Sequence, residues 1–86
     1  MNQTATNREL ENARAVPIQN LMGVKITKAK QHVVCPFHSD RSPSMVIYPD
    51  NSWYCFGCNA HGDNAIDFCI ELGYTFKETL EELNKY

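Results

Sequence analysis

The sequence has 86 residues, enough for one small domain whose apolar core alone gives only a marginal stability. Its net charge of −2, from 8 basic and 10 acidic side chains, argues against a general polyanion-binding protein. No stretch has the roughly 20 apolar residues of a membrane helix, and the polar residues 1–10 do not resemble a signal peptide. We therefore expect a cytoplasmic protein with no membrane partner.

Two helices are predicted before any strand. Residues 1–16 carry a short, weakly apolar helical pattern that we expect to be frayed, with Thr6 or Asn7 as its N-cap. Residues 17–23 open on a proline and end on a glycine, as helices with a proline in the first turn and a glycine C-cap do. This second segment is predicted to bury one face.

The middle of the chain has the composition of a small antiparallel sheet. Val24–Lys28 alternates apolar and polar residues, which predicts a half-exposed strand. Ser44–Tyr48 is rich in β-forming residues, and Ser52–Cys55 is predicted to return beside it. The intervening Pro49–Ser52 has the residues of a hairpin turn.

Residues 63–86 predict two further helices. The first begins after Asp63 or Asn64 and carries Cys69 among apolar neighbours, so we interpret Cys69 as a small core residue. The second opens on a Thr-Phe-Lys-Glu capping box at 75–78. Its buried face is predicted to consist of Phe76, Leu80 and Leu83.

Between these parts lie two ligand pairs of the kind that bind zinc. Cys35 and His38 form a C-x-x-H pair, and sixteen residues separate it from the C-x-x-C pair of Cys55 and Cys58. Zn²⁺ prefers tetrahedral nitrogen and sulfur ligands, and a two-residue spacer lets one turn present both side chains. Gly57 favours such a turn because glycine accepts a positive φ. The pattern predicts one structural Zn²⁺.

Three other interpretations of these residues are open. The cysteines could be ordinary core residues beside a buried histidine, or Cys55 and Cys58 could form a disulfide, as in a secreted domain. His61 or His32 could replace His38 as the fourth ligand, because each lies three residues from a cysteine. We prefer His38 because its spacing mirrors that of the second pair.

These elements predict an α+β zinc ribbon, a small antiparallel sheet with a tetrahedral zinc site, flanked by helices. We expect residues 1–86 to form a single domain with the ribbon at 24–58 and the C-terminal helices at 63–86. Charge divides along the chain: residues 23–49 carry four basic side chains and one acidic one, whereas residues 60–86 carry six acidic and two basic ones. A phosphate backbone could approach only the ribbon side.

The chain from Cys35 onward resembles a known family. The matching segments are Cys35–His38, Arg41–Ser44, Trp53–Cys58, Ala60–Gly62, Ala65–Phe68 and the helix from Phe76 to Leu83. In this order they resemble the N-terminal zinc-binding domain of bacterial-type DNA primases, including relatives on phages and conjugative elements. In that family, zinc is held at the positions of Cys35, His38, Cys55 and Cys58.

The resemblance implies a division of labour. Family members synthesise RNA primers on single-stranded DNA, and the zinc domain helps to select the start site while a separate polymerase domain performs the chemistry. This chain has no acidic cluster or glycine-rich phosphate loop of a polymerase, so we expect no catalytic residues in it. Its partners would be the template and a primase polymerase domain or replicative helicase, in cis or in trans.

Aromatic and basic side chains near the zinc motif are candidates for contact with single-stranded DNA, since bases stack on rings and cations follow the phosphates. Trp53 and Tyr54 are neighbours on a strand, so they point to opposite faces and at most one is available. The candidates are Lys28, Lys30, Arg41, Tyr48, Trp53, Tyr54 and His61. The alternative function is a structural zinc module that docks on a polymerase or helicase without binding DNA.

Overall fold

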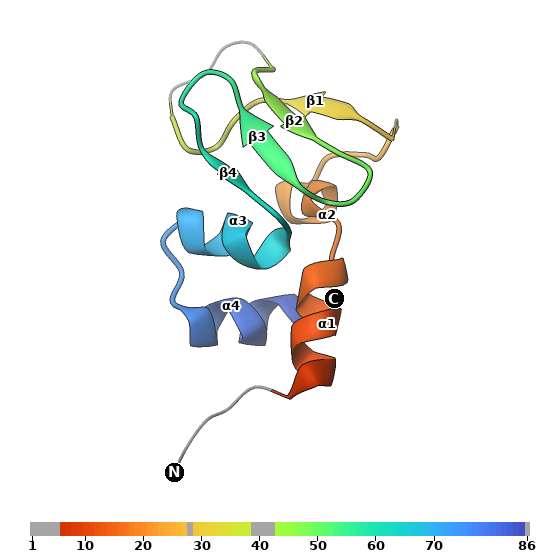
Figure 1. Ribbon diagram of the computed structural model, residues 1–86, viewed down its shortest axis with the longest axis vertical. Coiled ribbons are helices and arrows are strands. Elements are labelled where there is room, and N and C mark those ends of the chain that lie inside the picture. Colours follow the sequence, from red (N-terminus) through yellow and green to blue (C-terminus); the bar gives the residue numbers. More distant parts are fainter. Residues whose placement is uncertain (1–5, 28, 39–42, 86) are drawn as a thin grey trace.

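The computed structural model describes residues 6–27, 29–38 and 43–85, which form a four-stranded sheet stacked on helices (Figure 1). Two helices come first, α1 (Asn7–Ala15) and α2 (Ile18–Met22). The sheet follows, with strands β1 (Gln31–Val33), β2 (Met45–Ile47), β3 (Trp53–Cys55) and β4 (His61–Gly62), and then α3 (Ala65–Glu71) and α4 (Phe76–Leu83). The predicted α+β zinc-ribbon architecture is confirmed.

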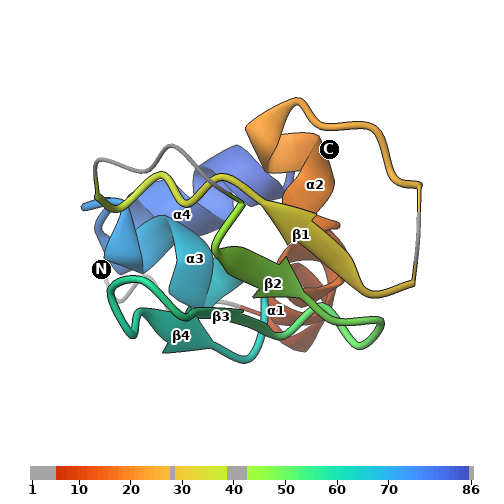
Figure 2. The ribbon, with the colours of Figure 1, turned by 90° about the horizontal axis from the view of Figure 1, so that it is seen from above.

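The sheet is antiparallel throughout and its strands lie side by side in chain order, as Figure 2 shows from above. Val33 lies opposite Met45, Met45 opposite Cys55, and Trp53 opposite Gly62. Each strand has only two or three residues, so hydrogen bonding within the sheet is limited. The sheet therefore depends on what covers its faces and its ends.

One predicted strand is wrong. Val24–Thr27 has no regular secondary structure, and Lys28 lies outside the described residues. The edge strand beside β2 is instead β1, directly before the first ligand pair. The buried Gln31 of β1 accepts a hydrogen bond from Gln19 Nε2 at 3.2 Å and donates to the carbonyl of Lys25 at 2.9 Å, so these amides tie the segment after α2 to the sheet.

Most helix ends have the caps read from the sequence, although Pro17, predicted as the first residue of its helix, is the N-cap of α2. Thr6 forms a capping box with Glu9 at the start of α1, and α2 ends at Gly23 in the left-handed conformation. Asn64 caps α3 through a bond from the N–H of Ile66, and a second capping box opens α4 at Thr75. Among the described residues, no helix combines the length and apolar character needed to cross a membrane.

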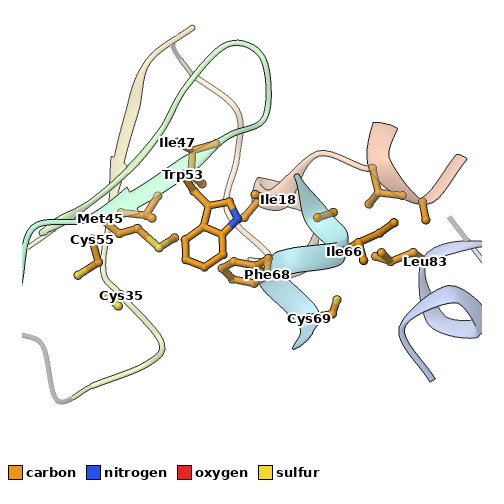
Figure 3. Packing of buried hydrophobic residues seen from close by; sticks show 14 of the residues in the cluster. Ile18, Cys35, Met45, Ile47, Trp53, Cys55, Ile66, Phe68, Cys69 and Leu83 are labelled. Carbon is orange, nitrogen blue, oxygen red and sulfur yellow. The ribbon is translucent and has the colours of Figure 1, made fainter. Parts of the chain in front are cut away.

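The core under the sheet is organised around Trp53, which is 1% exposed. Figure 3 shows its indole ring between the sheet residues Met45 and Ile47 and the helical residues Ile18 and Phe68. The rings of Trp53 and Phe68 meet edge to face with centroids 5.4 Å apart. This aromatic contact joins the sheet to α3.

A second part of the core lies farther from the sheet, where α3 packs on α1 and α4. Ala13, Leu80 and Leu83 are buried there, and so is Cys69, as its apolar neighbours predicted. Phe76 was expected on the same buried face, but it is 49% exposed: it is the first residue of α4, and the buried residues of this helix begin one turn later, at Thr79.

Candidate metal centre

Antiparallel pairing brings the two ligand pairs to the same end of the sheet. Cys35 and His38 lie just after β1, Cys55 is the last residue of β3, and Cys58 lies in the turn that follows. One ligand atom from each of these four side chains lies within 4.8 Å of all the others. The group could hold a single metal ion.

The distances and donor types fit zinc. The sulfur atoms of Cys35 and Cys58 are 3.8 Å apart, and two sulfurs each about 2.3 Å from a tetrahedral ion would be separated by about 3.8 Å. Nε2 of His38 lies 3.3 Å from the sulfur of Cys55. None of the four cysteines, all in the described part of the chain, forms a disulfide, so the disulfide interpretation of Cys55 and Cys58 is wrong.

Backbone N–H groups support the two turns. The N–H of Phe37 donates to Cys35 Sγ at 3.4 Å, and the N–H of Gly57 donates to Cys55 Sγ at 3.3 Å. Gly57 does not have the positive φ that we expected. Glycine is needed for space, because a Cβ at Gly57 would lie 2.9 Å from Nε2 of His38.

The two buried thiols differ in acidity. Burial raises the pKa of Cys35 to about 12, and its cysteine neighbours add to the rise. Burial also opposes ionisation of Cys55, but hydrogen bonds from Ser44, the backbone of Cys58 and His38 outweigh it and lower the pKa to about 6. Of these two thiols, Cys55 is therefore the readier to bind a cation at neutral pH, since the thiolate is the metal ligand.

The competing ligands lie elsewhere. His61 belongs to β4 and its Nδ1 lies 2.9 Å from the carbonyl oxygen of Asn59, while His32 is exposed in the middle of β1. Neither histidine is part of the four-residue group, and nor is Cys69.

The candidate DNA-contact residues are divided between the two faces of the sheet. Trp53 is in the core, so its ring faces are covered and it is removed from the candidates for base stacking. Tyr54 is on the opposite, outer face, where its ring stacks on His61 with centroids 5.9 Å apart. Lys30 Nζ lies 5.7 Å from the centre of the Tyr48 ring. Lys28 and Arg41 lie outside the described residues.

The sequence analysis missed one residue of this outer face. Phe56 is 66% exposed and its ring centroid lies 4.8 Å from that of Tyr54. The signal was present in the strand alternation, because a residue two positions after Tyr54 points to the same face. The C-x-x-C motif drew attention only to its cysteines and glycine.

Comparisons with known proteins agree with this geometry. Residues 5–86 match the model of the CHC2 zinc finger family. The chain is 38% identical, over 93% of its length, to the DNA primase of Chlamydia pneumoniae, and 42% identical, over 77% of its length, to the DNA primase of Escherichia coli. It covers 15% and 12% of those two proteins.

A solved structure shows the same fold. The crystal structure of the zinc-binding and RNA polymerase domains of Aquifex aeolicus primase superposes with a TM-score of 0.69 and 28% identity, covering 94% of this chain and 21% of that one. A family match over nearly the whole chain, a shared fold and a Cys-His-Cys-Cys group with zinc-like geometry lead to one conclusion. The chain belongs to the CHC2 zinc finger family, the zinc-binding domain of DNA primases.

Proposed function

We propose that this domain, with one structural zinc held by Cys35, His38, Cys55 and Cys58, contacts single-stranded DNA template and helps to select the start site for RNA primer synthesis. The bound ion would supply rigidity and no chemistry on the substrate. Primer synthesis would belong to a separate polymerase domain, acting in the cytoplasm during DNA replication. The relatives named above are primases, and this chain spans only a small part of each.

The outer face of the sheet carries the proposal. Register places His32, Val46, Tyr54 and His61 in one row across the four strands. The row has an aromatic ring near its middle and a histidine at each end, and Lys30 lies beside it over Tyr48. Rings for bases and cations for phosphates are the usual components of a single-strand binding face.

A titration of the zinc-loaded protein with short labelled oligonucleotides tests this function. We expect weak binding of single-stranded DNA that falls as salt rises, since phosphate contacts release counterions, and weaker binding of a blunt duplex whose base faces are hidden. The double variant Lys30→Ala, Tyr54→Ala should bind less. No detectable binding by the wild-type protein at low salt would contradict the proposal.

A second candidate function is docking on a polymerase or helicase domain. Four large apolar side chains around the turn between α3 and α4 are 43–49% exposed: Ile70, Leu72, Tyr74 and Phe76. Beside them, Glu78, Glu81 and Glu82 line a pocket with Tyr74 and Lys85. An apolar patch bordered by carboxylates suits a basic protein surface better than DNA.

The two functions separate experimentally. The charge-reversal variant Glu81→Lys, Glu82→Lys should lose binding to a primase polymerase domain in a pull-down and keep its affinity for single-stranded DNA if both functions are present. If it binds the polymerase domain as the wild type does, the docking role of this face is wrong.

A further inference from the structure

Three aromatic side chains, Tyr48, Tyr54 and Phe56, follow one another in a line along the outer face of the sheet. Tyr48 N donates to Ser52 O at 2.8 Å and Phe56 N donates to Ser44 O at 2.9 Å, so pairing of the two strands continues beyond both ends of β2 and β3. Tyr54 is opposite Val46, which makes Tyr48 its diagonal neighbour at about 7–8 Å. Phe56 follows Tyr54 by two residues, at the first position after β3.

The Phe56 ring is largely exposed to solvent. It is the most exposed large apolar side chain among the described residues, at 66%, whereas Val46 in the same face is 1% exposed. A single exposed apolar residue is ordinary. Here, however, the ring leans on Tyr54 at an angle of 57°, and Tyr54 in turn stacks on His61, so three flat side chains are grouped on one surface.

The metal-binding turn sets the position of this ring. Phe56 lies between Cys55 and Cys58, and its backbone is held by the bond to Ser44 O and by the adjacent bond from Gly57 N to Cys55 Sγ. Ser44 Oγ also lies 3.5 Å from Cys55 Sγ. When the four ligands close on an ion, Phe56 has little freedom to turn into the core, because both flanking backbone segments are fixed.

The neighbouring charges favour a nucleic acid over a protein as the occupant. Lys30 lies over the Tyr48 ring, and no acidic side chain belongs to the described strands β1 to β4. Asp50, in the hairpin turn beside Tyr48, accepts hydrogen bonds from the N–H and hydroxyl of Ser52. Glu78, Glu81 and Glu82 belong to α4, which lies with α1 at the end of the molecule away from the sheet in Figure 1, whereas Glu71 of α3 lines a pocket with His61. Flat rings beside a cation match unpaired bases joined by phosphates.

We infer that Phe56 stacks an unpaired base of the bound strand against the face formed with Tyr54, and that the closed metal-binding turn positions it for this contact. The inference rests on the proposed function and adds a residue to it. The zinc site would then contribute to DNA binding, because it holds the turn that carries the Phe56 ring. The bound DNA strand would cross the outer face of the sheet from Tyr48 to Phe56.

The test uses the zinc-loaded protein and a short single-stranded oligonucleotide that contains 2-aminopurine. Phe56→Leu keeps apolar bulk in the turn but removes the ring, and it should weaken binding roughly 5-fold to 150-fold, because stacking on one aromatic side chain contributes about 1–3 kcal/mol per base. It should also abolish quenching of 2-aminopurine on binding. Phe56→Tyr should retain both properties, and all variants should hold one zinc per chain.

Phe56→Tyr is the matched control, because it keeps a flat ring at the same position of the turn. If the wild type binds the oligonucleotide and Phe56→Leu binds equally well, the inference is wrong while the proposed function stands. If Phe56→Leu loses its zinc, or loses affinity for a polymerase domain and not for DNA, the stacking role is likewise overturned. Failure of the wild type to bind would refute both.

Discussion

The side-chain oxygen of Asn51 accepts a hydrogen bond from the backbone N–H of Ile18 at 3.1 Å, across 33 residues of sequence. The Asn51 amide group also donates to the carbonyls of Arg14 at 3.1 Å and Val16 at 2.8 Å. The hairpin turn between β2 and β3 thereby caps α2, whose N-cap Pro17 makes no side-chain cap bond, and fixes the end of α1. One side chain joins the sheet to both N-terminal helices.

Two substitutions of Asn51 should separate the stability that these hydrogen bonds contribute from the effect of its backbone conformation. Its φ is 73°, a conformation that glycine adopts freely and alanine does not. We expect Asn51→Gly to lose about 1–3 kcal/mol of unfolding free energy through the missing bonds, and Asn51→Ala about 1 kcal/mol more through backbone strain. Urea unfolding of the zinc-loaded proteins measures both. A glycine variant as stable as the wild type would show that the bonds contribute nothing.

Removal of a metal ligand should unfold the ribbon. Zinc binding by small domains contributes on the order of 10 kcal/mol, most of it folding free energy, so Cys58→Ala should bind less than one zinc per chain and lose its cooperative melting transition. EDTA should do the same to the wild type. Elemental analysis and thermal circular dichroism make the measurement.

Cys69→Ala is the control for ligand removal, since Cys69 is a buried thiol outside the metal group. It should keep one zinc per chain with only a small loss of stability. Full zinc occupancy in Cys58→Ala would mean that another residue completes the site.

A methyl group at Gly62 should disturb the core. Its Cβ would lie 2.6 Å from Cβ of Asp67 and 2.7 Å from Cζ2 of Trp53, so the ring or the strand must shift. We expect Gly62→Ala to lose about 1–3 kcal/mol and to change the fluorescence of the single tryptophan. Gly23→Ala, where a Cβ meets nothing within 4 Å but φ is 69°, should lose about 1 kcal/mol with unchanged emission. Identical emission spectra for the two variants would argue against the close contact.

Thr79 in α4 and Thr75 at its N-cap should respond in opposite ways to the same substitution. The hydroxyl of Thr79 is buried without a hydrogen-bond partner among the described residues, so Thr79→Val should stabilise the domain by about 1 kcal/mol. Thr75→Val removes the capping hydroxyl that accepts from the N–H of Glu78 and should destabilise it by about 1 kcal/mol. Denaturant midpoints measure the difference. A destabilised Thr79→Val would indicate that its hydroxyl does have a partner.

The capping box of α4 should add to acid sensitivity. Hydrogen bonds from the backbone N–H and hydroxyl of Thr75 lower the pKa of the exposed Glu78 carboxyl. A carboxyl whose pKa is lowered on folding stabilises the fold above its ordinary pKa, and this contribution disappears as pH falls through the lowered value. Between about pH 5 and pH 3 we therefore expect Glu78→Gln to lose less stability than the wild type.

Glu81→Gln, outside the capping box, is the control for this pH series and should follow the wild type. Comparison between variants cancels the release of zinc in acid, because all three proteins share the same ligands. Melting temperatures measured at half-unit pH steps give the curves, and parallel curves for Glu78→Gln and the wild type would contradict the prediction.

Local features were determined by the sequence alone. Each ligand pair lies within four residues, so a single turn decides whether its side chains can meet, and the spacing at Cys35 and Cys55 was sufficient to predict the metal group. The caps at Thr75 and Gly23 are equally local, because a cap depends on one side chain or one backbone angle within a turn of the helix.

Features that depend on distant segments were decided only by the tertiary structure. Alternation showed that Trp53 and Tyr54 face opposite ways, but the position of α2 and α3 determines that Trp53 is the buried one. The alternating pattern at Val24–Lys28 is typical of a strand. However, β2 pairs with β3 along one edge and can pair with only one strand along the other, and β1 takes that position. Asn51 looked like an ordinary turn residue, because hydrogen bonds to partners more than 30 residues away leave no pattern in the neighbouring sequence.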